Sequence, residues 1–299
     1  MTLTQDIGAA SPVDRPLRGI AYMLLSAGGF SAMSVAGKWL TADYAVAQII
    51  FFRSLVVLLA TGILIGARRD PALLRTQNWR GHFWRGLIGT LGMFFWFYSF
   101  HLLPLADAIA INFMGPVFAI LLAIIFLREP AHRQHWIALG AGFAGVLVMT
   151  QPGGGTVNWI GILVALGGAL TYGVSQMHVR RLGRTESPLT TVFIFSFFSL
   201  GVSVLLLPWF WRQPSALDLA LMVLTGVGAF IGQMFMTKAF ICAPAATVSP
   251  FHYTGLLWGV IFGNLLWDER PTPQILGGAA IIMAAGIYLA WRERPGRPM

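Results

Sequence analysis

The chain has 299 residues, of which 57% are hydrophobic and only 10% are charged. Soluble globular domains carry about 25% charged residues, so this composition leaves too little polar surface for a soluble fold and predicts a membrane protein. The net charge is +9, but the basic residues lie between apolar runs and do not form the basic stripe or tail of a nucleic-acid-binding protein. We therefore expect no nucleic-acid partner. The single cysteine, Cys242, excludes an internal disulfide.

Apolar runs follow one another along the chain, each close to the roughly 20 residues that a helix needs to cross a bilayer. We predict ten transmembrane helices over 17–38, 45–67, 83–103, 107–127, 135–151, 159–178, 189–210, 218–238, 247–266 and 274–291. The gaps between the runs are short and rich in Gly and Pro, so no extramembrane domain is expected. The expected fold class is an all-α polytopic membrane protein.

Basic residues fall mainly on the side of the membrane that holds the N-terminus. The densest group consists of Arg68, Arg69, Arg75, Arg80 and Arg85. The segments expected on the other side hold only Lys38, Arg212 and Arg270. Because cytoplasmic loops carry an excess of Lys and Arg, we predict cytoplasmic tails over 1–16 and 292–299.

The two halves of the chain resemble each other. An offset of 140 residues pairs Gly92 with Gly232 and Glu129 with Glu269. We therefore predict one five-helix repeat over 17–151 and a second over 158–291. Because each half has an odd number of helices, the second must enter the membrane from the opposite side. Such inverted repeats around a central cavity are typical of alternating-access carriers. A symmetric channel, the main physical alternative, is normally assembled from several subunits.

Several motifs carry a resemblance to a known family. They are Phe51-Phe52-Arg53, Ala106-Asp107-Ala108, Asn112-Phe113-Met114-Gly115-Pro116-Val117 and Phe126-Leu127-Arg128-Glu129, with a second copy around Ala246-Thr247-Val248, Gly255 and Trp267-Asp268-Glu269-Arg270. They resemble the EamA family of the drug/metabolite transporter superfamily. The resemblance implies a ten-helix carrier in the bacterial inner membrane. Many such carriers export amino acids or related metabolites, and the YddG-like aromatic amino-acid exporters are similar.

Polar and aromatic residues within the runs are the candidates for substrate binding, because polar groups in lipid are costly unless they face a cavity or another helix. Three pairs occupy equivalent places in the two repeats: Asn112 with His252, Tyr98 with Lys238, and Phe30 with Tyr172. Trp96, Gln176 and Tyr253, together with His101 and His178, complete the set. The alternatives are bonds between helices for the polar residues, packing for the aromatic ones, and, for Lys238, extension to the interface.

Backbone positions suggest where helices bend. Gly115 and Pro116 remove a hydrogen bond within the fourth run, and Pro250 acts similarly in the ninth, so we expect kinks that serve gating. Arg53, well inside the second run, is expected to bind carbonyl groups of neighbouring helices.

The remaining observations limit the function. No Asp or Glu is expected at mid-membrane, which disfavours proton coupling through a buried carboxylate. The sequence has no Walker motif, so ATP is not expected as the energy source, and it has no cofactor or metal motif. The first hypothesis is an exporter of amino acids, aromatic or otherwise apolar, whose partners are that small molecule and the lipid bilayer. The alternative is a multidrug or nucleotide-type carrier of the same fold. A membrane-embedded enzyme is remote, with only His252 and Ser249 to suggest one.

Overall fold

The computed structural model describes residues 15–41, 43–69, 73, 75–76, 78–103, 111–151, 158–267 and 272–292. Within these ranges the regular structure is helical throughout. The long helices are α1 (Pro16–Leu40), α2 (Val46–Arg68), α3 (Trp79–Leu102), α6 (Arg133–Thr150), α7 (Trp159–Leu182), α8 (Pro188–Phe210), α9 (Ala216–Cys242) and α12 (Pro273–Arg292). The all-α fold expected from the sequence is confirmed.

Two further spans are built from shorter pieces. The fourth contains α5 (Gly115–Leu122), which continues into the π-helical η2 (Ala123–Leu127). The ninth consists of α10 (Ala245–Val248), the 3-10 helix η3 (Ser249–Thr254) and α11 (Gly255–Trp267). Proline lacks the N–H group that a helix interior needs but is tolerated in a first turn. Accordingly, Pro116 lies in the first turn of α5 and Pro250 in the first turn of η3.

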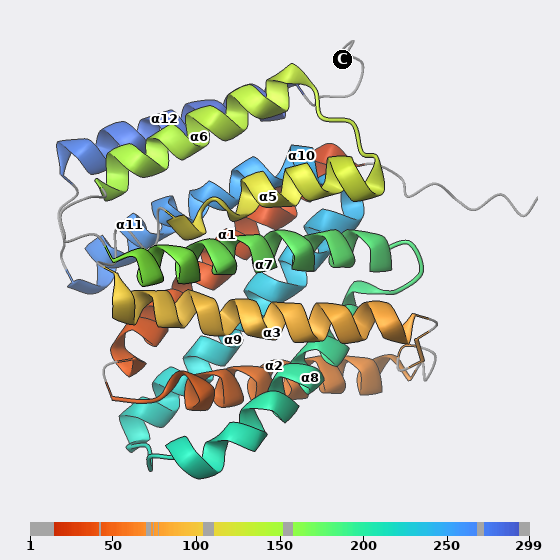
Figure 1. The fold of residues 1–299 in the computed structure, drawn as a ribbon, viewed down its shortest axis with the longest axis vertical. Helices are drawn as coiled ribbons and strands as arrows, with labels where there is room; N and C mark the ends of the chain where they lie inside the picture. Colours follow the sequence, from red (N-terminus) through yellow and green to blue (C-terminus); the bar gives the residue numbers. More distant parts are fainter. Residues whose placement is uncertain are drawn as a thin grey trace, which may run out of the picture.

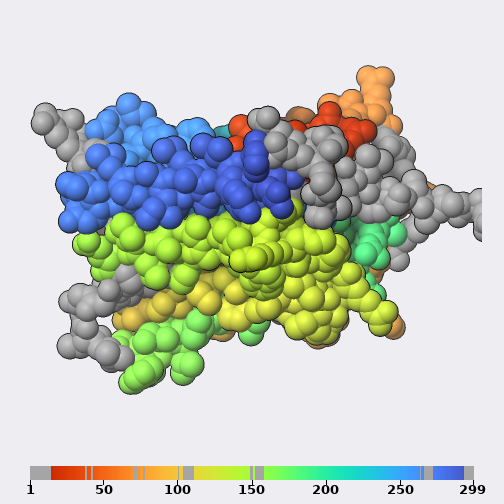
Figure 2. All heavy atoms as spheres, turned by 90° about the horizontal axis from the view of Figure 1, so that it is seen from above, coloured from red at the N-terminus to blue at the C-terminus, as the bar shows by residue number. Residues whose placement is uncertain are grey.

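Helix lengths and hydropathy agree with a membrane environment. Of the described helices, six are long and apolar enough to cross a bilayer: α1, α2, α7, α8, α9 and α12. Large apolar side chains point outward, such as Ile63 and Leu205, each 71% exposed. Figure 2 shows α6 and α12 lying side by side on one such face. The predicted limits differ by four residues at three places: α3 begins at Trp79, where the Asn78 side chain accepts a hydrogen bond from the Gly81 amide, α7 ends at Leu182, and α9 ends at Cys242.

The main packing contacts pair helices from before residue 151 with helices from after residue 158. α1 packs on α9, α3 on α7, α2 on α8, and α6 on α12. In Figure 1 the α6–α12 pair lies at one end of the molecule and the α2–α8 pair at the other, with α1, α3, α7 and α9 between them. These four helices therefore form the centre of the helix bundle.

Contacts between helix ends establish the chain directions. The Arg15 amide donates to the Cys242 carbonyl at 2.9 Å, which joins the start of α1 to the end of α9. The Asn158 side chain donates to the Leu102 carbonyl at 3.1 Å, which joins the end of α3 to the start of α7. The Arg180 side chain near the end of α7 donates to carbonyl groups near the end of α9, so α7 ends at the face where α1 begins. Hence α1 and α7 begin on opposite faces. We call the face where α1 begins the arginine-rich face, since Arg18, Arg68, Arg133 and Arg292 lie on helix ends there, and the other the opposite face.

Candidate functional site

A cavity of about 590 Å³ lies between the central helices. Small-molecule sites are typically about 300–1,000 Å³, so the cavity has room for a metabolite. Its lining comes from α1, α2, α3, α7, α8, α9, η3 and α11, and therefore from both halves of the chain. The lining reaches Thr41, which directly follows α1 at the opposite face.

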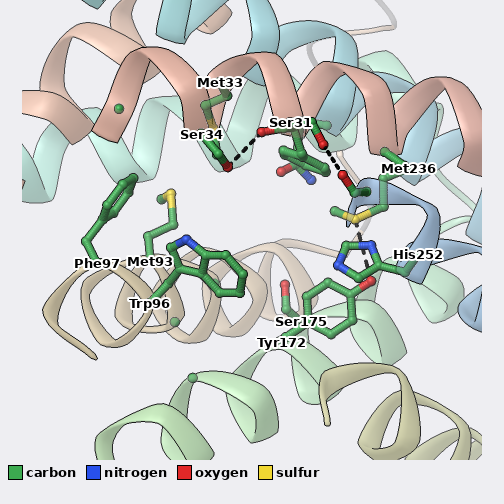
Figure 3. Close-up of a pocket in the computed structure, with 18 of the residues that line it drawn as sticks. Ser31, Met33, Ser34, Met93, Trp96, Phe97, Tyr172, Ser175, Met236 and His252 are labelled. Atoms are coloured by element: carbon green, nitrogen blue, oxygen red, sulfur yellow. Dashed lines mark hydrogen bonds between the residues drawn. The ribbon is translucent and has the colours of Figure 1, made fainter. Parts of the chain in front are cut away.

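Aromatic side chains form one wall of the cavity (Figure 3). The rings of Tyr172 and His252 lie 5.1 Å apart between centroids, and the Tyr172 hydroxyl contacts the sulfur of Met236 at 3.9 Å. Trp96 reaches the same space from α3. These surfaces suit a flat or apolar group of a substrate, because aromatic rings pair favourably with one another beyond the area that they bury.

Small polar groups are distributed over the same lining. Ser31 donates to the Gly255 carbonyl at 2.7 Å and Ser34 to the Phe30 carbonyl at 2.9 Å, so both hydroxyls have a partner within the helices (Figure 3). By contrast, the buried Oε1 of Gln176 and Nδ1 of His252 have no hydrogen-bond partner among the described residues. Buried polar atoms without partners are uncommon, so these two are available to a bound molecule.

Two arginines also line the cavity, Arg53 from α2 and Arg85 from α3. Their side chains are nearly inaccessible, with 3% and 1% exposure. The expectation that Arg53 binds helix carbonyls is wrong for its Nε and Nη1 atoms, which have no partner in the described part of the chain. Arg85, counted among the arginines of a cytoplasmic loop, is instead buried within α3, with its guanidinium 4.0 Å from the centre of the Phe195 ring.

Five of the predicted site residues line the cavity: Phe30, Trp96, Tyr172, Gln176 and His252. The other four lie outside the lining. Asn112 is buried and donates to the Ser99 hydroxyl at 3.0 Å. Tyr98 is 52% exposed, away from the cavity, and stacks on His101. Lys238 lies over the rings of Tyr22 and Phe235. Tyr253 is fully buried and packs against Phe113 and Phe143.

A polar cluster joins four helix ends at the arginine-rich face. The Nε of Arg180, at the end of α7, donates to Glu129, which follows η2. The Nη1 of Arg180 donates to the carbonyl groups of Phe240 and Ile241 at 3.2 and 3.0 Å, and Glu129 accepts from the Ala245 amide at 3.0 Å. Both side chains are about nine-tenths buried. This cluster ties the two halves together on the side away from Thr41.

These features define a multi-pass membrane protein that encloses a cavity for a small molecule. A model of the EamA-like transporter family matches residues 17–151 and again residues 159–292. The chain therefore belongs to this family of the drug/metabolite transporter superfamily, as the sequence motifs indicated, and it is a transporter and not an enzyme.

Similar proteins include transporters of several metabolites. A riboflavin transporter of Rhizobium johnstonii is 31% identical over 93% of this chain and 93% of its own. An S-adenosylmethionine uptake transporter of Rickettsia prowazekii is 30% identical over 93% and 94%. A pseudopaline exporter of Pseudomonas aeruginosa is 29% identical over 91% and 95%. A solved crystal structure that is 18% identical shares the fold, with a TM-score of 0.77 over 92% of this chain and 98% of that one.

Proposed function

We propose that the chain is a secondary carrier that exports small metabolites, foremost amino acids with an aromatic or apolar side chain, across the bacterial inner membrane by alternating access. The observation that carries this proposal is a cavity lined by both halves, which reaches the opposite face while the Glu129–Arg180 cluster joins helix ends at the arginine-rich face. In each state of an alternating-access carrier, the cavity is open to one face of the membrane and closed to the other.

The proposed inverted repeat rests on separate observations. The family model matches the chain twice, over 17–151 and 159–292. The first helices of the two matched segments, α1 and α7, begin on opposite faces, and the α1–α9 and α3–α7 contacts exchange when the halves are exchanged. The many arginines on one face support a cytoplasmic location for that face and for both termini, by the positive-inside tendency.

The cavity wall supports a cargo with an aromatic or apolar part. Trp96, Tyr172 and His252 offer ring surfaces, while Gln176 and the serines offer hydrogen bonds. An amino acid of the kind handled by YddG-like exporters combines both features. The names of the relatives favour a second candidate, a nucleotide-type carrier, because S-adenosylmethionine and riboflavin both carry a fused aromatic ring system. A multidrug carrier would use the same cavity with less selectivity.

Transport into liposomes tests the proposal. Purified protein in liposomes is expected to move at least one of a panel of labelled amino acids without ATP, and runs with and without an imposed pH gradient will show whether protons are coupled. Labelled S-adenosylmethionine and riboflavin form the second arm. Flux of neither set would contradict the proposal, whereas flux of the second set alone would replace amino acids by a nucleotide-type cargo.

Filling the cavity is expected to stop this flux. Ser34 points into the cavity from α1, so Ser34→Trp places a large ring in the space that the cargo needs, and flux should fall to the level of protein-free liposomes. Leu25→Trp is the matched control, because Leu25 is 49% exposed on the outer side of the same helix. Equal flux in the two variants would remove this cavity from the transport route.

A further inference from the structure

Two positive charges in the cavity have no counter-charge from the described part of the chain. Arg53 and Arg85 are 3% and 1% exposed, and both line the cavity. The Nε and Nη1 atoms of both guanidinium groups are buried without a hydrogen-bond partner among the described residues. Buried charges in proteins are normally paired or bound to a ligand, because removing an ion from water is costly. The two buried guanidinium groups therefore require an anion to compensate their charges.

The described carboxylates are engaged elsewhere. Glu129 pairs with Arg180, and Asp43 pairs with Arg212. Asp218 accepts from Tyr44 at 2.7 Å. Glu186 accepts from Thr76 at 2.6 Å and lies 3.9 Å from His82. No described carboxylate lies within ion-pair distance of Arg53 or Arg85, so the described part of the chain supplies no counter-charge to either guanidinium group.

An aromatic ring holds one of the two guanidinium groups in place. Arg85 lies over the Phe195 ring, an interaction that holds the cation without supplying a negative charge. Both guanidinium groups line the same cavity, and guanidinium groups bind carboxylate and phosphate oxygens in a bidentate manner.

The cationic and aromatic parts of the cavity come from different elements. Arg53 and Arg85 belong to α2 and α3, and Phe195 to α8, whereas His252 belongs to η3 and packs on Tyr172 of α7. Figure 1 shows α2 and α8 on the side of the molecule away from α5 and α11. A bound molecule can therefore place an anionic group toward α2 and α8 and an apolar or aromatic group toward η3.

We propose that Arg53 and Arg85 form the binding site for an oxyanion group, a carboxylate or a phosphate, on an organic cargo whose apolar part lies against Tyr172 and His252. This inference rests on the proposed carrier function and narrows its cargo to organic anions and zwitterions. Neutral or purely cationic molecules lack the group that would compensate the two charges.

Binding to the purified protein in detergent tests the site separately from transport. The probes are L-phenylalanine, L-phenylalaninamide, phenyl phosphate and inorganic phosphate, with affinity measured by calorimetry. We expect phenylalanine or phenyl phosphate to bind at least about tenfold more tightly than the amide. The preferred one of the two identifies carboxylate or phosphate as the natural group. Binding that persists without flux of any labelled substrate would refute the carrier function and leave the site intact.

Variants connect the affinity to the two arginines. Arg53→Gln and Arg85→Gln should each lower the affinity for the anionic probe by about tenfold to a hundredfold and leave the affinity for the amide unchanged. Arg53→Lys and Arg85→Lys retain the charge, should restore part of the affinity, and serve as the test where a Gln variant fails to fold. Arg181→Gln, an exposed arginine of α7, is the control and should bind as the unmodified protein does.

Three outcomes would overturn the inference. The first is equal affinity for phenylalanine, its amide and phenyl phosphate. The second is unchanged anion binding in well-folded Gln variants. The third is that inorganic phosphate binds as tightly as phenyl phosphate and phenylalanine does not bind, which would make the site one for a small inorganic ion and not for an organic cargo.

Discussion

Arg180→Gln is expected to open the cavity toward the arginine-rich face. Arg180 donates to Glu129 and to the carbonyl groups of Phe240 and Ile241, so its loss leaves Glu129 buried without its cation and frees the end of α9. Removing one partner of a buried pair costs about 3–5 kcal/mol. If only half of this cost acts on the closed arrangement alone, the balance between the two states shifts by about tenfold or more.

A cysteine in the cavity reports this shift. Cys242→Ala removes the single native thiol, and Ser34→Cys then places one in the cavity lining. A membrane-impermeant thiol reagent, applied to vesicles of either orientation, measures access from each face. In the parent, labelling should be faster from the opposite face. With Arg180→Gln added, labelling from the arginine-rich face should rise by about tenfold or more.

The neighbouring residue supplies a matched control. Arg181 carries the same charge on the same helix but is exposed, so Arg181→Gln should leave both labelling rates unchanged. Glu129→Gln should act in the same direction as Arg180→Gln, because it removes the same ion pair from the other side. Identical labelling of Arg180→Gln and the parent would show that the cluster does not close this face.

The spans could be predicted from the sequence because a helix in lipid satisfies its own backbone hydrogen bonds. Each predicted run that the structure describes falls on a helix. The largest differences are four residues, at the start of α3, which Asn78 caps, and at the ends of α7 and α9. Hydropathy does not show whether an individual side chain faces the cavity or another helix. Asn112 illustrates this, because its polar group is buried against Ser99 and not in the cavity lining, although its repeat partner His252 is in the lining.

Arg85 shows which signal was missed. In the sequence it follows a series of loop arginines, and counting charges placed it with them. Helical spacing would have placed it differently, because Arg85, Gly89, Gly92, Met93 and Trp96 recur at intervals of three and four and form one face of α3, all of it lining the cavity. Tyr98 follows Trp96 by two positions, which turns it to the far side of the helix, where it is exposed.

A close backbone approach between α1 and α9 predicts a second large effect, on stability. A methyl group added at Gly29 of α1 would lie 2.5 Å from the Gly232 amide nitrogen and 2.9 Å from the Gly228 carbonyl oxygen of α9. Both contacts are backbone atoms, so relief requires the helices to separate. Small residues at such crossings allow close helix packing in lipid, and overpacking costs about 1–3 kcal/mol or more.

Gly29→Ala should therefore lower the thermal unfolding midpoint in detergent and the yield of monodisperse protein. Gly201→Ala is the control, because nothing lies within 4 Å of a methyl group there and alanine favours helix formation. An equal midpoint in the two variants would contradict the tight crossing. Since α1 carries the cavity lining on one side and this crossing on another, Ser34→Trp should remove flux at an unchanged midpoint, whereas Gly29→Ala should lower the midpoint itself. That contrast separates the proposed cargo-binding part of α1 from the part that packs against α9.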